Sequence, residues 1–254
     1  MVTALVRSSD PGGDAAGKEF WESSWKGLKP ELYKGPVFQF AHLAKRFLPA
    51  DRSKKLIELG AMPGNHLVYF QKEFGYHVTG LDYVSEINLL RETFEINQMQ
   101  EYEIINADLF SVNYTNEYDI VFSSGLVEHF DDATAIMDKH YEILRPGGLL
   151  FIGLPNTRYV HWFLMRLFCK DILNVHRTHL MSLQVLQNYA RKKRMEVLFC
   201  DYVTTFRVFY PVPAWFTWCC RAFGKVLVVL RMREISNKFG SPFIFLIAKK
   251  RETL

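Results

Sequence analysis

The chain has 254 residues and a formal net charge of +4 at pH 7, with 49% hydrophobic and 15% aromatic residues. This length fits one large α/β domain, or one domain with a cap, and supplies enough apolar residues for a core. The mild charge and the lack of a basic, aromatic motif disfavour a nucleic-acid partner. The four cysteines lack the paired spacing of a zinc site and do not imply a disulfide framework.

The first 35 residues form an N-terminal segment that differs from the rest of the chain. Residues 1–18 contain Gly, Ser and Asp and no apolar signal core, which predicts a frayed N-terminus and a reduced, cytoplasmic protein. Phe20, Trp21 and Trp25 then form an aromatic cluster. This cluster predicts either a helix packed on the edge of the core or a lid over a ligand.

From residue 36 onward, strand and helix patterns alternate with short connections. Apolar residues at helical spacing predict a helix over residues 36–48, with Pro36 in its first turn. Continuous apolar runs predict five buried strands, at residues 56–59, 77–82, 102–106, 118–123 and 149–154. This alternation predicts an α/β fold with a doubly wound, mostly parallel sheet, because strands covered on both faces read as continuous apolar runs.

Short polar and glycine-containing signals predict where the intervening helices begin and end. Ser85 is a candidate cap for the helix after the second strand, and Asp131 or Asp132 for the helix after the fourth. Residues 146–148, Pro-Gly-Gly, are predicted to end that later helix before the fifth strand.

Beyond residue 156 the alternation loosens, and two cap elements are predicted at residues 157–181 and 203–241. Residues 36–254 are therefore expected to form one domain that carries these two caps. The regular elements expected around the caps are a helix from Ser182 and two last strands at residues 195–202 and 243–248.

The second cap contains an unusual apolar stretch at residues 208–220. A membrane-spanning helix needs about 20 apolar residues, and this stretch is shorter and holds two prolines. Three interpretations remain open: a lid over the substrate, a homodimer contact, or docking of residues 208–233 on a membrane surface. Docking would use interfacial tryptophans and lipid-facing cations, namely Trp215, Trp218, Arg221, Lys225, Arg231 and Arg233.

The most informative stretch is the end of the first strand, where Glu58 precedes a turn that holds Gly60 and Gly64. Glycines let the backbone approach a ligand closely, and the helix that follows directs its free N–H groups into the same crevice. Asp82 ends the next strand, about 20 residues later, where a carboxylate can hold ribose hydroxyls. The Gly60–Gly64 spacing differs from the dinucleotide G-x-G-x-x-G pattern, which argues against a nicotinamide dehydrogenase.

Together with Asp108 and residues 144–148, Leu-Arg-Pro-Gly-Gly, this pattern resembles the class I S-adenosylmethionine (SAM)-dependent methyltransferases. It is most similar to the small-molecule O-methyltransferases of the ubiquinone-biosynthesis type, over residues 54–156. The resemblance implies a Rossmann-like sheet of about seven strands with an antiparallel last strand, and SAM as cofactor. It also implies that the N-terminal segment 1–35 can close over the cofactor.

The resemblance further implies which residues contact the cofactor. Asp82 would accept the ribose hydroxyls, with Tyr83 beside the adenine. Asp108 would accept a hydrogen bond from the adenine amino group, and the Leu109 backbone N–H would donate a hydrogen bond to the adenine ring. The other expected contacts are Glu58 near the amino-acid end, Gly60, Ala61 and Gly64 in the loop, and Ser123, Ser124 and Gly125 after the fourth strand.

Residues 124–130 follow the fourth strand and hold the predicted catalytic pair. His129 is the expected general base, since an imidazole can take a proton near neutral pH, and Glu128 is expected to orient it. Alternatively, His129 only packs against the cofactor or bonds the backbone. No metal site is expected. Three histidines of the first cap can be structural, exposed or directed at the substrate: His161, His176 and His179.

These features predict a SAM-dependent methyltransferase that moves a methyl group to a small-molecule acceptor at oxygen. The aromatic caps favour an acceptor that is apolar, lipid-linked or sugar-linked. The alternative is a non-catalytic binding or scaffold subunit, because Met62 stands where the family usually has a third glycine and can narrow the approach to the cofactor.

Overall fold

The computed structural model describes residues 16–36, 38–85, 87–204, 206–229 and 236–252. The predictions made for residues 1–15, Arg231 and Arg233 lie outside these ranges, as do those for the side chains of Arg221 and Lys225.

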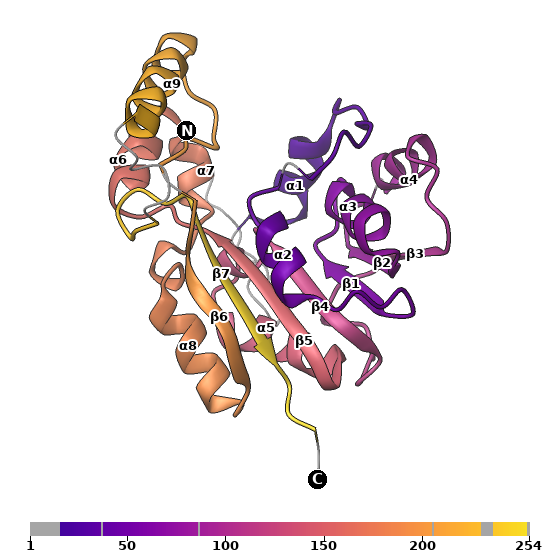
Figure 1. Ribbon diagram of the computed structural model, residues 1–254. Coiled ribbons are helices and arrows are strands. Elements are labelled where there is room, and N and C mark those ends of the chain that lie inside the picture. Colours follow the sequence, from indigo (N-terminus) through magenta and orange to yellow (C-terminus); the bar gives the residue numbers. More distant parts are fainter. Residues whose placement is uncertain (1–15, 37, 86, 205, 230–235, 253–254) are drawn as a thin grey trace.

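A seven-stranded sheet with the order β3-β2-β1-β4-β5-β7-β6 forms the centre of the molecule (Figure 1). Neighbouring strands among β1 to β5 are parallel, and β7 runs antiparallel to both β5 and β6. The order reverses between β1 and β4, and ligands of open α/β sheets bind at such a point. The strands are β1 (Lys55–Leu59), β2 (His77–Asp82), β3 (Tyr102–Asn106), β4 (Tyr118–Ser124), β5 (Leu144–Pro155), β6 (Glu196–Val203) and β7 (Phe243–Lys249).

Helices cover both faces of the sheet because successive side chains of each strand point to opposite faces. Leu56 and Phe122 pack in one apolar cluster with helices α2, α3 and α4, and their neighbours Ile57 and Val121 pack in another with α5 and α8. The bounds of these helices are α2 (Ala41–Phe47), α3 (Asn65–Phe74), α4 (Asn88–Ile96), α5 (Ala133–Ile143) and α8 (Leu183–Lys192).

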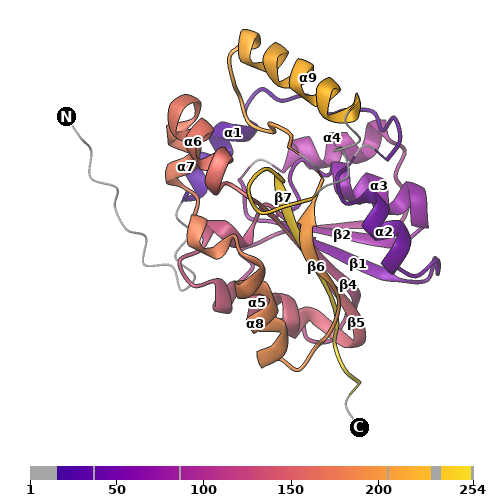
Figure 2. The same ribbon diagram turned by 60° about the vertical axis from the view of Figure 1, so that its left-hand side comes forward.

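Three further helices, α6 (Tyr159–Phe168), α7 (Lys170–Asn174) and α9 (Ala214–Val229), come from the two predicted cap segments. A third apolar cluster holds them together, with Met165 and Tyr210 among its buried members. His161 fixes the cluster, since one ring nitrogen lies 3.1 Å from the Tyr210 hydroxyl and the other 3.0 Å from the Gly240 carbonyl oxygen. Figures 1 and 2 show these helices at the same end of the molecule as α1 (Lys18–Trp25).

The predicted α/β architecture is confirmed, with the mostly parallel sheet and the antiparallel last strand β7. The caps contribute an aromatic helical cluster. The carboxylate of Asp132 accepts from the backbone N–H groups of Thr134 and Ala135 and caps α5 as predicted. No helix within the described ranges is long and apolar enough to cross a membrane.

Two helix starts were predicted wrongly. The helix expected over residues 36–48 begins only at Ala41, because a turn before it buries the ring of Phe40 among the aromatic residues of α3. Ser85 does not cap α4. Its backbone N–H donates to the carboxylate of Glu22 at 3.0 Å, and the helix starts at Asn88.

The expected helix stop at residues 146–148 was also wrong, because α5 ends at Ile143 and these residues lie inside β5. The pairing of β5 with β4 shifts there, from Tyr118 opposite Leu144 to Ile120 opposite Leu149. The glycines are needed at this irregularity. A Cβ on Gly148 would lie 2.8 Å from the carbonyl oxygen of Asp119.

Candidate active site

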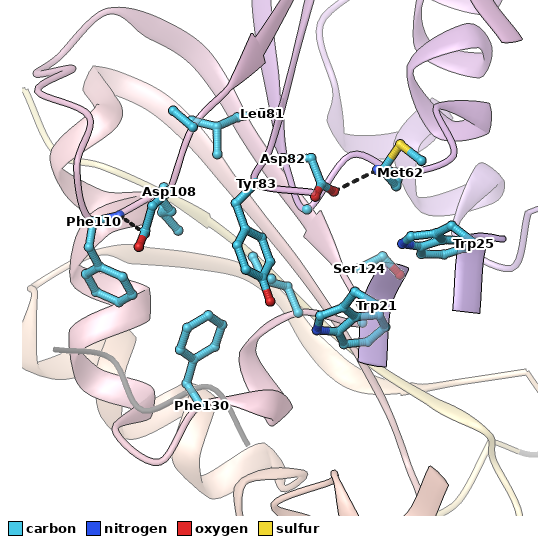
Figure 3. Close-up of a pocket in the computed structure, with 15 residues that line it drawn as sticks. Trp21, Trp25, Met62, Leu81, Asp82, Tyr83, Asp108, Phe110, Ser124 and Phe130 are labelled. Atoms are coloured by element: carbon cyan, nitrogen blue, oxygen red, sulfur yellow. Dashed lines mark hydrogen bonds between the residues drawn. The ribbon is translucent and has the colours of Figure 1, made fainter. Parts of the chain in front are cut away.

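A cavity opens at the carboxyl ends of β1, β2, β3 and β4, where the strand order reverses (Figure 3). Apolar and aromatic side chains form most of its wall, with two carboxylates among them. Its lining residues are Trp21, Trp25, Gly60, Met62, Leu81, Asp82, Tyr83, Ala107, Asp108, Leu109, Phe110, Ser124, Gly125, Leu126 and Phe130.

The turn after β1 brings backbone to the cavity wall. Gly60 has φ +73°, and the backbone N–H groups of Gly60 and Ala61 both donate to the Leu81 carbonyl, at 2.9 and 3.2 Å. A Cβ on Gly60 would lie 3.1 Å from the side chain of Leu126, which also lines the cavity. A side chain at position 60 would therefore be strained and would crowd this wall.

Asp82 is buried at the end of β2 and is held by backbone donors. One carboxylate oxygen accepts the Met62 N–H at 3.0 Å and the other accepts the Val84 N–H at 3.3 Å. Burial raises the pKa of Asp82, and these backbone hydrogen bonds oppose that rise. A carboxylate has about four acceptor positions, so Asp82 keeps capacity for further donors.

Met62 lines the cavity beside Asp82 without filling it (Figure 3). Its backbone N–H supports the Asp82 carboxylate and its side chain forms part of the wall. Met62, which stands where the family usually has a glycine, therefore still leaves a cavity next to the Asp82 carboxylate.

The other end of the cavity lies after β3. The Asp108 carboxylate accepts the backbone N–H of Phe110 at 2.7 Å, and Leu109 lies between them in the wall. The ring of Phe110 contacts that of Phe130 edge to face, with centroids 5.8 Å apart. Figure 3 shows Tyr83 between this aromatic pair and Trp21.

Helix α1 covers the cavity with Trp21 and Trp25 and has no buried residue of its own. Glu22 fixes it to the segment after β2 through the Ser85 N–H, at 3.0 Å. Trp21 also stands edge-on to the ring of His129, with centroids 4.6 Å apart. Because few contacts hold α1, it can move away from the cavity at a low cost in free energy.

Seven of the predicted cofactor residues line this cavity: Gly60, Asp82, Tyr83, Asp108, Leu109, Ser124 and Gly125. Four others lie behind its wall: Glu58, Ala61, Gly64 and Ser123. Of the residues that the sequence reasoning missed, Ala107 and Phe110 flank the predicted pair after β3. The sequence could have indicated both residues, because they closely follow the carboxyl end of the predicted third strand.

Three of these four residues, Glu58, Gly64 and Ser123, have contacts within the protein. Glu58 accepts from the His66 ring at 2.7 Å, and Ser123 bonds the His140 ring at 2.8 Å. Gly64 has φ +96°, and a Cβ there would clash with Leu90 and lie 3.0 Å from Phe94. This glycine is therefore needed for packing of the loop against α4.

The predicted catalytic pair is buried directly behind Trp21. One ring nitrogen of His129, Nδ1, lies 3.1 Å from the Val175 carbonyl oxygen, and the other, Nε2, lies 3.6 Å from a Glu128 oxygen. Burial lowers the pKa of His129 to about 4 and raises the pKa of Glu128 to about 8. Near pH 7 the histidine is therefore neutral and the glutamic acid is protonated.

His176 also contacts His129, with ring centroids 5.0 Å apart. Burial and the neighbouring His129 lower the pKa of His176 to about 3. Glu128, His129 and His176 offer three donor atoms within 4.8 Å of one another, a grouping that could hold a metal ion and that the sequence reasoning did not predict.

Solved structures with the same fold are methyltransferases. Phosphoethanolamine N-methyltransferase 2 of Haemonchus contortus, bound to phosphomonomethylethanolamine and S-adenosylhomocysteine, matches with a TM-score of 0.60 and 15% identity over 98% of this chain and 62% of that one. Geranyl diphosphate C-methyltransferase of Streptomyces coelicolor matches with a TM-score of 0.58 and 12% identity over 84% of this chain and 77% of that one. The fold is that of the Rossmann-like methyltransferases.

Sequence comparison agrees with the fold. The family model described as "Methyltransferase domain" matches residues 37–192. The ubiquinone biosynthesis O-methyltransferase of Aromatoleum aromaticum is 27% identical over 124 residues, which is 48% of this chain and 53% of that protein. Phosphoethanolamine N-methyltransferase 2 of Caenorhabditis elegans is 28% identical over 120 residues, 46% of this chain and 27% of that protein. The matches thus span about half or less of these relatives.

The chain belongs to the methyltransferase-domain family, and its fold is that of the class I SAM-dependent methyltransferases. Proteins similar to it methylate oxygen, nitrogen or carbon by their names, so the family alone leaves the acceptor atom open.

Proposed function

We propose that the protein binds SAM in the cavity at the carboxyl ends of the strands and transfers its methyl group to an oxygen atom of a small, apolar acceptor. The observation that carries this proposal is Asp82, a buried carboxylate that borders the cavity and is held in place by backbone N–H groups.

The residues around the cavity suit a nucleoside. Asp82 would accept hydrogen bonds from the ribose hydroxyls. Asp108, on the far side, would accept a hydrogen bond from the amino group of the adenine, whose ring would lie between Leu81, Tyr83 and Leu109. Gly60 and Gly125 leave the backbone open on the side where the rest of the cofactor would lie. Bound SAM supplies an electrophilic methyl group on a sulfonium sulfur.

Oxygen is the proposed acceptor atom because His129, behind Trp21, is neutral near pH 7 and can accept a proton. Methylation of a hydroxyl forms a C–O bond, breaks the C–S bond and releases the hydroxyl proton, which needs a base. A neutral His129 whose Nδ1–H donates to Val175 keeps its lone pair on Nε2. Glu128 lies 3.6 Å from that nitrogen without a hydrogen bond to it and would orient the ring by packing.

An apolar acceptor is proposed from the composition of the wall. Trp21, Trp25, Leu126 and Phe130 line the cavity, and Trp21 stands edge-on to the predicted base. We propose that α1 opens to admit the ligands and that Trp21 then uncovers His129. The cytoplasmic location, the absence of a nucleic-acid partner and the homodimer remain predictions from the sequence.

The test is transfer of a labelled methyl group from SAM to a panel of hydroxylated aromatic and lipid-linked acceptors, with a chelator present so that metal ions do not contribute. We expect an organic-extractable O-methyl product. His129→Ala should lower kcat roughly 10²–10⁴-fold and leave S-adenosylhomocysteine affinity intact, while His42→Ala, at an exposed position on α2, should match the parent.

Other outcomes would contradict the proposal. An N-methyl product would refute oxygen as the acceptor, and full turnover of His129→Ala would remove this histidine as the base. Binding of the cofactor without transfer to any acceptor would favour the scaffold alternative.

A further inference from the structure

Helix α6 exposes apolar side chains on the face that points away from the core. Leu164 and Met165 are buried, but Phe163 and Leu167 are each 63% exposed, and Trp162 and Tyr159 are exposed as well. A helix on the surface of a globular protein normally presents polar residues on its outer face. The outer face of α6 is thus suited to an apolar environment.

Helix α9 continues this apolar surface. Trp215 is 64% exposed and Trp218 is 71% exposed, while Phe216 between them packs against Phe168 at the end of α6, with ring centroids 5.1 Å apart. Figures 1 and 2 show α6 and α9 next to each other at one end of the molecule. We call Tyr159, Trp162, Phe163, Leu167, Trp215 and Trp218 the α6–α9 surface.

The segments that form this surface are strongly basic. Residues 157–181 and 203–241 together contain ten Lys or Arg and two Asp or Glu, a formal charge of +8, so the rest of the chain carries −4. Arg166, Lys170, Arg207 and Lys238 are exposed. None of these four pairs with a carboxylate within the described ranges.

We propose that the α6–α9 surface docks on an anionic lipid bilayer, with both helices lying in the plane of the interface. Tryptophan and tyrosine favour the membrane–water interface, and Lys or Arg near an anionic leaflet strengthens binding by electrostatic attraction. A second copy of this chain fits less well, because a symmetric contact would bring two basic surfaces together.

The surface is part of a fixed platform. The Cys169 thiol donates to the Pro211 carbonyl at 2.6 Å, and His161 joins α6 to Tyr210 and Gly240. The segments that lead into α6 and α9 leave the carboxyl ends of β5 and β6, on the same edge of the sheet as the cavity. Docking therefore places the cavity near the interface, where a lipid-linked acceptor of the proposed function would lie.

The test is co-sedimentation of the full chain with vesicles of phosphatidylglycerol and phosphatidylcholine, and with phosphatidylcholine alone. We expect binding to the anionic vesicles that weakens as salt rises. Trp215→Ala with Trp218→Ala should lower the affinity at least about tenfold. Leu28→Ala with Leu32→Ala is the matched control, since both leucines are exposed away from this surface, and it should bind like the parent.

Failure of the parent to sediment with anionic vesicles would overturn the proposal, as would unchanged binding of the tryptophan variant. A dimer in analytical ultracentrifugation that the tryptophan variant abolishes would assign the surface to a second copy instead. S-adenosylhomocysteine binding measured on the same preparations separates this inference from the proposed function, because docking does not need the cofactor and cofactor binding does not need vesicles.

Discussion

Two of the buried carboxylates near the cavity, Asp82 and Glu128, are satisfied very differently. Both oxygens of Asp82 accept backbone N–H groups, whereas neither oxygen of Glu128 has a hydrogen-bond partner in the described part of the chain. A buried charge without partners is costly, which is why the pKa of Glu128 rises to about 8. Asp82 is therefore suited to bind a ligand as a carboxylate, and Glu128 to hold a proton.

We predict that Glu128→Gln stabilises the protein at high pH. Between pH 4.5 and about 8 the folded state keeps a proton on Glu128 that the unfolded state has lost, so wild-type stability falls as pH rises through this window. Glutamine cannot ionise. The Tm of the variant should exceed that of the wild type by a margin that widens by roughly 2–4 °C per pH unit from pH 5.5 to 8.

The matched control for this experiment is Glu95→Gln, at an exposed position on α4. Its Tm should follow the wild type across the pH range in differential scanning fluorimetry. A Tm margin for Glu128→Gln that does not change between pH 5.5 and 8 would show that residue 128 is ionised when folded.

Helix α1 shows how much of an element's role the sequence can predict. The aromatic cluster allowed either a packed helix or a lid, and the helix holds Trp21 and Trp25 over the cavity without burying any residue. Sequence could not predict that Trp21 would also cover His129, because that contact joins residues more than a hundred positions apart. For the same reason the turn that shortens α2 depends on Phe40 packing against α3 and could not be predicted.

We predict that Trp21→Ala weakens retention of the cofactor product. Loss of the ring removes one wall of the cavity, so S-adenosylhomocysteine should dissociate roughly tenfold faster in a stopped-flow displacement measurement. Ser24→Ala, an exposed position on the same helix, is the control and should leave the rate unchanged. Equal rates for the Trp21 variant and the wild type would remove α1 as a lid.

At the scale of the whole molecule, the sheet could be predicted because most of its parallel strands are largely apolar runs that the structure buries, and the edge strand β3 is the exception. The carboxyl-end positions of Asp82 and Asp108 followed from that sheet. The hydrogen bonds of Glu58 and Ser123 could not be predicted, since their partners His66 and His140 depend on how the helices pack. The uneven charge, with +8 in the two cap segments, can be counted from the sequence. Which apolar side chains of these segments are exposed could be seen only in the folded structure.

The central claim is that the cavity beside Asp82 holds the nucleoside of SAM. Calorimetric titration with S-adenosylhomocysteine tests it most directly. We expect one site in the wild type, about 10–100-fold weaker binding for Asp82→Asn through loss of charged hydrogen bonds, and unchanged binding for Asp171→Asn, at an exposed position on α7. No binding to the wild type, or equal affinity for Asp82→Asn, would contradict it.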